Sequence, residues 1–365
     1  MAAFPHIPNF ALKKCLGSGG AADVFLAVDE KRSRLVAIKV LTNSRFANTI
    51  AVRRFIKEAQ TISRLHHPNI VRIIGTGKAN DQHYMVMEFL PESLKQRIRA
   101  RKQIGLQESL AIVNQIASAL FYAHGRGFIH RDVKPDNIMF RADGTPVILD
   151  FGIARVLEAT SKITRSGTSL GTPRYMSPEQ LKAKRVDGRS DIYSLGVVLY
   201  EMLSGVPPFK GSQTVSVVLK HINEPIPKLP GELLSCQPLI ERMMAKERDE
   251  RIANEAEWRE MIKPLLTPFK LPKVARENFA GLPSARDREK TRLSMGQGES
   301  RVEKSRQPQS RRKPKANRRR RFILNLLLVL AIVVWVFLDY ERIPGLALSL
   351  WRALTTWLSS LLAKI

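Results

Sequence analysis

The spacing of apolar residues over the first part of the chain predicts two pairs of strands with a helix between them. Residues 10–30 and 34–41 combine apolar runs with a glycine-rich stretch and indicate a β-hairpin. Residues 49–67 place apolar side chains at helical spacing, which predicts an amphipathic helix. Residues 70–77 and 83–90 predict two more strands.

From about residue 94 onward the spacing becomes mostly helical. The clearest helices are expected over residues 110–124 and 190–204, and a short β-like run at 146–150 lies between them. We therefore expect an α+β arrangement in which a strand-rich lobe of about residues 10–90 is followed by a helical lobe of about residues 91–267.

A polar and basic stretch follows over residues 268–321. It is rich in Pro, Ser, Gln and Arg and has no sustained apolar period, so a disordered linker is predicted. The stretch holds 18 Lys/Arg and 5 Asp/Glu, about half of the net charge of +27 that the 365 residues carry. A uniformly basic chain would suggest nucleic acid as a partner, but charge gathered in one stretch argues against it.

The apolar run Phe322–Leu338 predicts a single transmembrane helix. Its 17 residues would rise roughly 25 Å, the short end of what spans a bilayer, and a buried globular helix is the alternative. Eight of the eleven residues 311–321 are basic, which marks the cytoplasmic side and suits anionic lipid headgroups. A nucleic-acid tail or localisation signal is the competing interpretation. We expect a single pass through the cell (inner) membrane, with residues 10–267 in the cytoplasm and the C-terminus outside.

Residues 339–365 predict a short amphipathic segment on the outer membrane surface. Six apolar residues fall on one helical side: Leu346, Leu350, Leu354, Trp357, Leu358 and Leu361. A second, poor span over residues 346–362 is the alternative. The beginning of the chain shows no cleavable export signal, because it lacks a basic start and an apolar run.

The two cysteines, Cys15 and Cys236, lie far apart and in no metal-ligand spacing. A disulfide framework is therefore not expected, and a reducing compartment fits better. Both are expected to be isolated buried thiols.

Two motifs on the predicted strands point to phosphate chemistry. "GSGGAADV" at residues 17–24 places glycines where backbone amides can approach phosphate oxygens. "VAIK" at residues 36–39 places Lys39 within reach of the same phosphates, and Glu58 on the predicted helix could pair with it. Either motif alone is weak, because glycine turns and solvated strand lysines are common.

Three further motifs follow: "HRDVKPDN" at residues 130–137, "DFG" at 150–152 and "SPE" at 177–179. All five motifs, in this order over residues 10–267, resemble the protein kinase family. Ala22 replaces the third glycine of the family's loop, a mild departure because that turn often accommodates a methyl group. Lys134 and Thr172 resemble the serine/threonine branch, and "GTPRYMSPEQ" resembles bacterial kinases.

The resemblance implies the bilobal protein-kinase fold and transfer of the ATP γ-phosphoryl group to Ser/Thr hydroxyls of protein substrates. It implies that Asp132 accepts the hydroxyl proton and that Lys134 faces the transferring group. Lys39 would hold the α- and β-phosphates, while Asn137 and Asp150 would bind Mg²⁺ or Mn²⁺, hard cations that prefer oxygen ligands.

The resemblance also implies a nucleotide site between the lobes. Met87 would be the gatekeeper, and the backbone of residues 88–90 would pair with the base. The residues expected to line the site are Leu16, Gly17, Ser18, Gly19, Gly20, Val24, Ala37, Lys39, Met87, Glu88, Leu90 and Met139.

Other residues would support or regulate the site. Asp191 resembles the residue that tethers the catalytic loop, Glu179 would pair with Arg251, and His130 is expected to pack. Phosphorylated, a loop hydroxyl gains about −1.5 to −2 charge and could order its segment by pairing with Arg131. We expect autophosphorylation at Thr164, Ser166 or Thr168, with Thr172 in the same loop; a mobile loop whose hydroxyls have no role is the alternative.

A pseudokinase, in which the same fold serves as a scaffold or binding module, is the alternative for the whole chain. Lys39, Glu58, Asp132, Asn137 and Asp150 are all present, which favours an active enzyme. No sizeable sensor domain fits into the 27 residues after the apolar run, so membrane partners or a homodimer would carry the signal.

Overall fold

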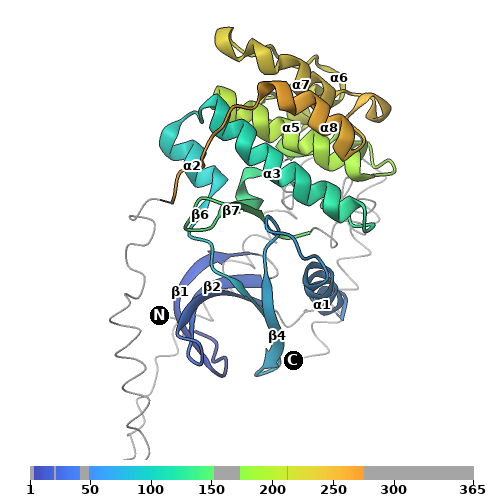
Figure 1. Ribbon diagram of the computed structural model, residues 1–365. Coiled ribbons are helices and arrows are strands. Elements are labelled where there is room, and N and C mark those ends of the chain that lie inside the picture. Colours follow the sequence, from blue (N-terminus) through green and yellow to red (C-terminus); the bar gives the residue numbers. More distant parts are fainter. Residues whose placement is uncertain (1–3, 20–21, 42–48, 152–172, 212, 275–365) are drawn as a thin grey trace, which may run out of the picture. The chain divides into compact units, whose positions relative to one another are not determined.

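The computed structural model describes residues 4–19, 22–41, 49–151, 173–211 and 213–274, which form a strand-rich lobe and a helical lobe (Figure 1). In this part of the chain no helix has both the length and the apolarity needed to cross a bilayer. The predicted transmembrane run and the segment after it lie outside the described residues.

The first lobe is built on a five-stranded antiparallel sheet in the order β1-β2-β3-β5-β4. Its strands are β1 (Phe10–Ser18), β2 (Ala22–Asp29), β3 (Arg34–Leu41), β4 (Ile73–Ala79) and β5 (Gln82–Glu88). Helix α1 (Thr49–Ser63) packs Phe55 and Ala59 against Leu41 and Met85 of the sheet. The apolar stripe that predicts the helix is therefore the face that it buries.

The segment between α1 and β4 differs from its predicted boundaries. Helix α1 ends at Ser63 rather than at residue 67, since a residue before proline is pushed out of the helical region and Pro68 follows. Strand β4 begins at Ile73 rather than at residue 70, because the preceding residues pair with another strand. The Val71 N–H donates to Ile148 O at 3.1 Å, and this bond joins the first lobe to the second.

The second lobe is mainly helical, and α3 and α5 form its centre. Short strands β6 (Glu92–Ser93), β7 (Ile138–Phe140) and β8 (Pro146–Ile148) form a small sheet facing the first lobe (Figure 1). The helices are α2 (Leu94–Arg101), α3 (Leu106–His124), α4 (Pro178–Leu181), α5 (Gly188–Ser204), α6 (Thr214–Asn223), α7 (Gln237–Met244) and α8 (Glu255–Ile262). Short 3₁₀ turns are η1 (Pro135–Asn137), η3 (Pro173–Tyr175), η4 (Gly231–Cys236), η5 (Arg248–Glu250) and η6 (Lys263–Leu265).

Helix α5 is buried over almost its whole length. Asp187 caps its first turn by accepting from the Arg189 N–H, and Gly205 ends it in the left-handed region at φ 76°. Most apolar residues of α3 and α5 are buried, for example Ile116 and Leu195. This rigid core supports the loop that carries Asp132.

The chain continues in contact with the second lobe beyond the predicted end at residue 267. The Val274 N–H donates to Ala142 O at 3.2 Å, and its side chain is buried. A Cβ on Gly144, whose φ is +94°, would lie 2.3 Å from Pro272 O, so only glycine fits there. We call residues 266–274 the tail strap; the remainder of the predicted linker lies outside the described residues.

Both cysteines are free thiols, as expected. Cys236 is buried, but the prediction that Cys15 is also buried is wrong: Cys15 is exposed. The physical reason is that β1 is an edge strand, with its second half facing solvent.

Candidate active site

Helix α5 holds in place the loop before β7, which contains His130 and Arg131. Both carboxylate oxygens of Asp191 accept backbone N–H groups, from His130 at 2.8 Å and from Arg131 at 2.7 Å. His124 Nε2 lies 2.7 Å from the same carboxylate. Arg131 has φ +66°, an unfavourable conformation for a side chain with a Cβ, so these bonds hold the loop in a strained shape.

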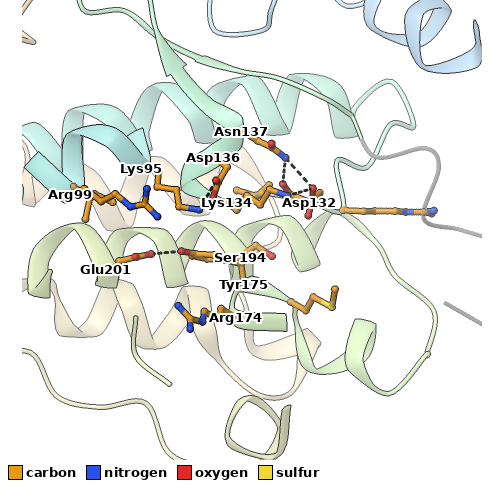
Figure 2. Close-up of a pocket in the computed structure, with 14 residues that line it drawn as sticks. Lys95, Arg99, Asp132, Lys134, Asp136, Asn137, Arg174, Tyr175, Ser194 and Glu201 are labelled. Atoms are coloured by element: carbon orange, nitrogen blue, oxygen red, sulfur yellow. Dashed lines mark hydrogen bonds and ion pairs between the residues drawn. The ribbon is translucent and has the colours of Figure 1, made fainter. Parts of the chain in front are cut away.

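The loop places Asp132, Lys134 and Asn137 side by side (Figure 2). Lys134 Nζ donates to Asp132 Oδ2 at 2.7 Å, and Asn137 Nδ2 donates to the same oxygen at 3.1 Å. The Asp132 N–H donates to His130 Nδ1 at 3.2 Å. His130 itself is buried and stacks on Phe151, which agrees with a packing role.

A second cluster joins the two lobes through Lys39. Its Nζ donates to Glu58 Oε1 at 2.8 Å and to Asp150 Oδ1 at 3.0 Å. Burial opposes the lysine charge, but Asp150 and Glu58 outweigh it and raise the pKa of Lys39. Burial raises the pKa of Glu58 to about 7 against the opposing effect of Lys39. For Asp150, the charge of Lys39 outweighs desolvation and lowers the pKa.

Asn137 and Asp150 carry side-chain oxygens of the kind that a hard cation prefers. The Leu149 N–H donates to Asn137 O at 2.9 Å, which sets the residue before Asp150 against the catalytic loop. Asn137 Nδ2 also donates to Asp132 O at 2.8 Å, so the amide nitrogen faces Asp132 and the amide oxygen is turned away from it. Mg²⁺ typically binds one or two such protein oxygens together with phosphate and water.

The residues predicted to line a nucleotide site come from both lobes. In the glycine-rich turn, the Gly19 N–H donates to Ala22 O at 3.1 Å and Ser18 Oγ donates to Asp23 Oδ1 at 2.5 Å. Leu16 is exposed. The remaining described members of the set are Gly17, Val24, Ala37, Met87, Glu88, Leu90 and Met139, of which Ala37, Met87 and Leu90 are buried.

Glu88 also has a role that the sequence did not indicate. Its carboxylate accepts from Arg141 Nε at 2.7 Å and Arg141 Nη2 at 2.8 Å, and from the Arg72 N–H at 2.9 Å. Arg141 follows β7 and also donates to Pro68 O at 2.5 Å. This guanidinium therefore fastens the end of β5 to the second lobe, a contact between segments too distant in sequence for any spacing to reveal.

A buried ion pair joins Arg251 to Glu179 at the start of α4. Arg251 Nη1 and Nη2 donate to Glu179 at 2.7 and 2.9 Å, with the arginine fully buried and Ser190 Oγ donating to the same carboxylate. The positive charge and hydrogen bonds outweigh desolvation and lower the pKa of Glu179. Arg131 differs, because its buried Nε has no hydrogen-bond partner in the described part of the chain.

Most of the chain matches a known protein family. The family described as "Protein kinase domain" matches residues 10–263. The chain belongs to the protein kinase family. The predicted two-lobed kinase fold is thereby confirmed.

Several curated relatives of this kinase domain come from bacteria. The probable serine/threonine-protein kinase PknB of Lactococcus lactis is 36% identical over 274 residues, 74% of this chain and 44% of that protein. PknB of Mycobacterium leprae is 38% identical, over 70% of this chain and 43% of that protein. PrkC of Bacillus subtilis is 39% identical, over 65% and 37%. The chain spans less than half the length of these relatives, and the predicted resemblance to bacterial serine/threonine kinases is confirmed.

Several predicted residues of the kinase domain lie outside the described part of the chain. They are Gly20 of the glycine-rich turn, Gly152 of the "DFG" motif, and the loop hydroxyls of Thr164, Ser166, Thr168 and Thr172. Their roles stay predictions.

Beside the catalytic loop lies a pocket of about 460 Å³ that the sequence did not reveal. Besides Asp132, Lys134 and Asn137, its walls include Lys95, Arg99, Asp136, Arg174, Tyr175, Ser194 and Glu201 (Figure 2). These residues come from α2, η1, η3 and α5. Asp136 lies in "HRDVKPDN", and Arg174 and Tyr175 lie in "GTPRYMSPEQ". Only the folded chain brings these three residues together with the residues of α2 and α5.

Proposed function

We propose that this chain is an active serine/threonine protein kinase that transfers the γ-phosphoryl group of ATP to hydroxyl groups of proteins. The observation that carries the proposal is the paired arrangement of Lys39 with Glu58 and Asp150, next to the Asp132–Lys134–Asn137 cluster. A scaffold has no need for the complete set of charged groups that phosphoryl transfer uses.

In the proposed reaction the substrate hydroxyl oxygen attacks the γ-phosphorus and forms the new O–P bond. The bond between the γ-phosphorus and the bridging oxygen breaks, and ADP leaves with that electron pair. The Asp132 carboxylate receives the hydroxyl proton. Lys134, 2.7 Å from Asp132, is close enough to stabilise the charge on the phosphoryl oxygens during transfer.

Lys39 would bind the α- and β-phosphates, with Glu58 keeping its ammonium extended across the cleft. Asn137 and Asp150 would hold Mg²⁺ or Mn²⁺, which when bound offsets the negative charge of the phosphates. The backbone of residues 88–90 would pair with the adenine base beside Met87. Glu179, Asp191 and Arg251 would maintain the shape of the site without touching substrate.

The deciding experiment is transfer of ³²P from ATP to a generic protein substrate by the full chain and by Asp132→Asn. We expect a loss of about a hundredfold or more in the variant, the lower range for removing a positioned acid–base group. Binding of ATP with Mg²⁺, measured by calorimetry, should persist in both proteins. Nucleotide binding without transfer by the wild type would instead identify a pseudokinase.

We further propose that the kinase is tethered to the cell membrane by residues 322–338, with its domain cytoplasmic. The basic flank at residues 311–321 and the apolar run support this topology. The full chain should stay with membranes after alkaline extraction, whereas a chain ending at residue 321 should be released. Release of both would refute the tether.

Autophosphorylation of the loop at Thr164, Ser166 or Thr168 is the regulatory part of the proposal. Arg131 supports it, because its cationic side chain lies next to Asp132 and its Nε lacks a partner among the described residues. Mass spectrometry of the active protein should find phosphate between residues 160 and 172. An active protein with no phosphate there would contradict this mechanism.

A further inference from the structure

The pocket beside Asp132 contains more positive than negative side chains. Five basic residues line it, against three acidic ones. The basic residues are Lys95, Arg99, Arg131, Lys134 and Arg174, and the acidic ones are Asp132, Asp136 and Glu201. Because the pocket adjoins the group that would receive the hydroxyl proton, the residues that flank the acceptor in a substrate would enter it.

The two acidic residues that could attract a basic substrate side chain are already engaged. Lys95 Nζ from α2 donates to Asp136 Oδ1 at 2.6 Å, so a cation of the protein itself covers that carboxylate (Figure 2). Tyr175 OH donates to Glu201 Oε2 at 2.6 Å, and burial raises the pKa of Glu201. Each carboxylate therefore already has a hydrogen-bond partner from the protein itself.

Two arginines at the same pocket remain available. Arg99, one turn after Lys95 on α2, and Arg174 on η3 are exposed, and neither forms an ion pair within the described part of the chain. Figure 2 places them on opposite sides of the Tyr175–Glu201 pair. A guanidinium binds a carboxylate through two parallel hydrogen bonds, which suits a Glu or Asp side chain.

We infer that this pocket selects protein substrates in which an acidic side chain flanks the Ser/Thr acceptor, and that Lys95 is the specificity-determining residue. Arg99 and Arg174 bind the substrate carboxylate, and Lys95 prevents Asp136 from repelling it. The inference rests on the proposed kinase activity. It adds the substrate class, which the catalytic residues alone do not determine.

Three peptides test the inference with the full chain. They share one threonine acceptor and differ in having glutamate, glutamine or arginine at the flanking positions. We expect kcat/KM to be about tenfold higher for the glutamate peptide than for the arginine peptide, mainly through KM, and the ratio to shrink at high salt. Equal values, or a preference for arginine, would overturn the inference while leaving the kinase activity established.

Lys95→Glu should reverse the preference towards the arginine peptide, and Lys95→Arg should retain the wild-type preference. Folding of Lys95→Glu is not threatened, because an acid in the first turn of α2 suits the helix dipole. The matched control is Lys228→Glu, an exposed lysine outside the pocket, which should leave the order of the peptides unchanged. A reversal in the control would show a general charge effect instead.

Fluorescence anisotropy of the labelled peptides distinguishes a failure of the proposed kinase activity from a failure of the proposed substrate selectivity. If no peptide is phosphorylated, the proposed activity fails, but tighter binding of the glutamate peptide and its loss in Lys95→Glu would still support the pocket's selectivity. Equal binding of all three peptides would overturn it independently of catalysis.

Discussion

The contact between Lys39 and Glu58 should make the proposed nucleotide binding depend on pH. Glu58 has a pKa of about 7, raised by burial, so it gains a proton as the pH falls through neutrality. The protonated acid no longer balances Lys39, whose raised pKa keeps it charged throughout this range. All three groups of the cluster, Lys39, Glu58 and Asp150, therefore carry their charges together only above about pH 7.

We expect the affinity for ATP with Mg²⁺ to fall several-fold between pH 8 and pH 6 in the wild type. In Glu58→Gln this titration is absent, so affinity should be lower at pH 8 and should change less with pH. Isothermal calorimetry at a series of pH values measures both. A parallel pH dependence in the two proteins would show that another group is responsible.

The residues of the short motifs could be predicted because each motif carries its own geometry. Asp132, Lys134 and Asn137 fall within six residues, and the turn that contains them sets their contacts. Lys95 and Asp136 are 41 residues apart, so no local sequence pattern predicts their ion pair. What the sequence could not supply is which distant side chains share a pocket.

Residues 10–41 form three strands where the pattern predicts a two-stranded hairpin. The other predicted strands and helices agree with the structure except near their ends. The interior of α1 follows its apolar period, but its end depends on Pro68, and the start of β4 depends on bonds to β8. Residues 268–274 lack any period, yet the tail strap packs because Gly144 leaves room for Pro272. Such boundaries are set by tertiary contacts rather than by local spacing.

The buried pair between Arg251 and Glu179 connects α4 to the segment before α8. Arg251→Leu leaves the Glu179 carboxylate buried without its partner, and this should lower the free energy of unfolding by about 3–5 kcal/mol. Urea unfolding of the kinase domain measures the change. The matched control is Arg259→Leu, whose exposed pair with Glu255 should contribute no more than about 0.5 kcal/mol. Similar losses in both would contradict the importance of burial.

At the scale of the whole domain, the two lobes are joined by a side chain as well as by the chain itself. Arg141 lies in the second lobe and donates to Glu88 at the end of β5 and to Pro68 O. This guanidinium adds a side-chain contact to the other hydrogen bonds between the lobes, from the Val71 N–H to Ile148 O and from Lys39 to Asp150. The pair is partly exposed, so its energy is modest and its effect is mainly on motion.

Arg141→Gln should cost about 1 kcal/mol of stability and speed hydrogen exchange of the amides around residues 86–90. The control is Arg126→Gln, an exposed arginine stacked on Tyr122 at the far end of α3, which should leave exchange in that segment unchanged. Unchanged exchange in Arg141→Gln would mean that this guanidinium does not restrain the end of β5.

The tail strap has a practical consequence for anyone who prepares the domain in isolation. The family match ends at residue 263, but the fold continues to Val274, whose side chain lies buried beside the β7–β8 turn. A recombinant fragment cut at the family boundary would expose that site, with Ala142 O unpaired and an apolar patch open to solvent. A fragment that ends after residue 274 keeps the surface closed, and it is the natural choice for crystallisation.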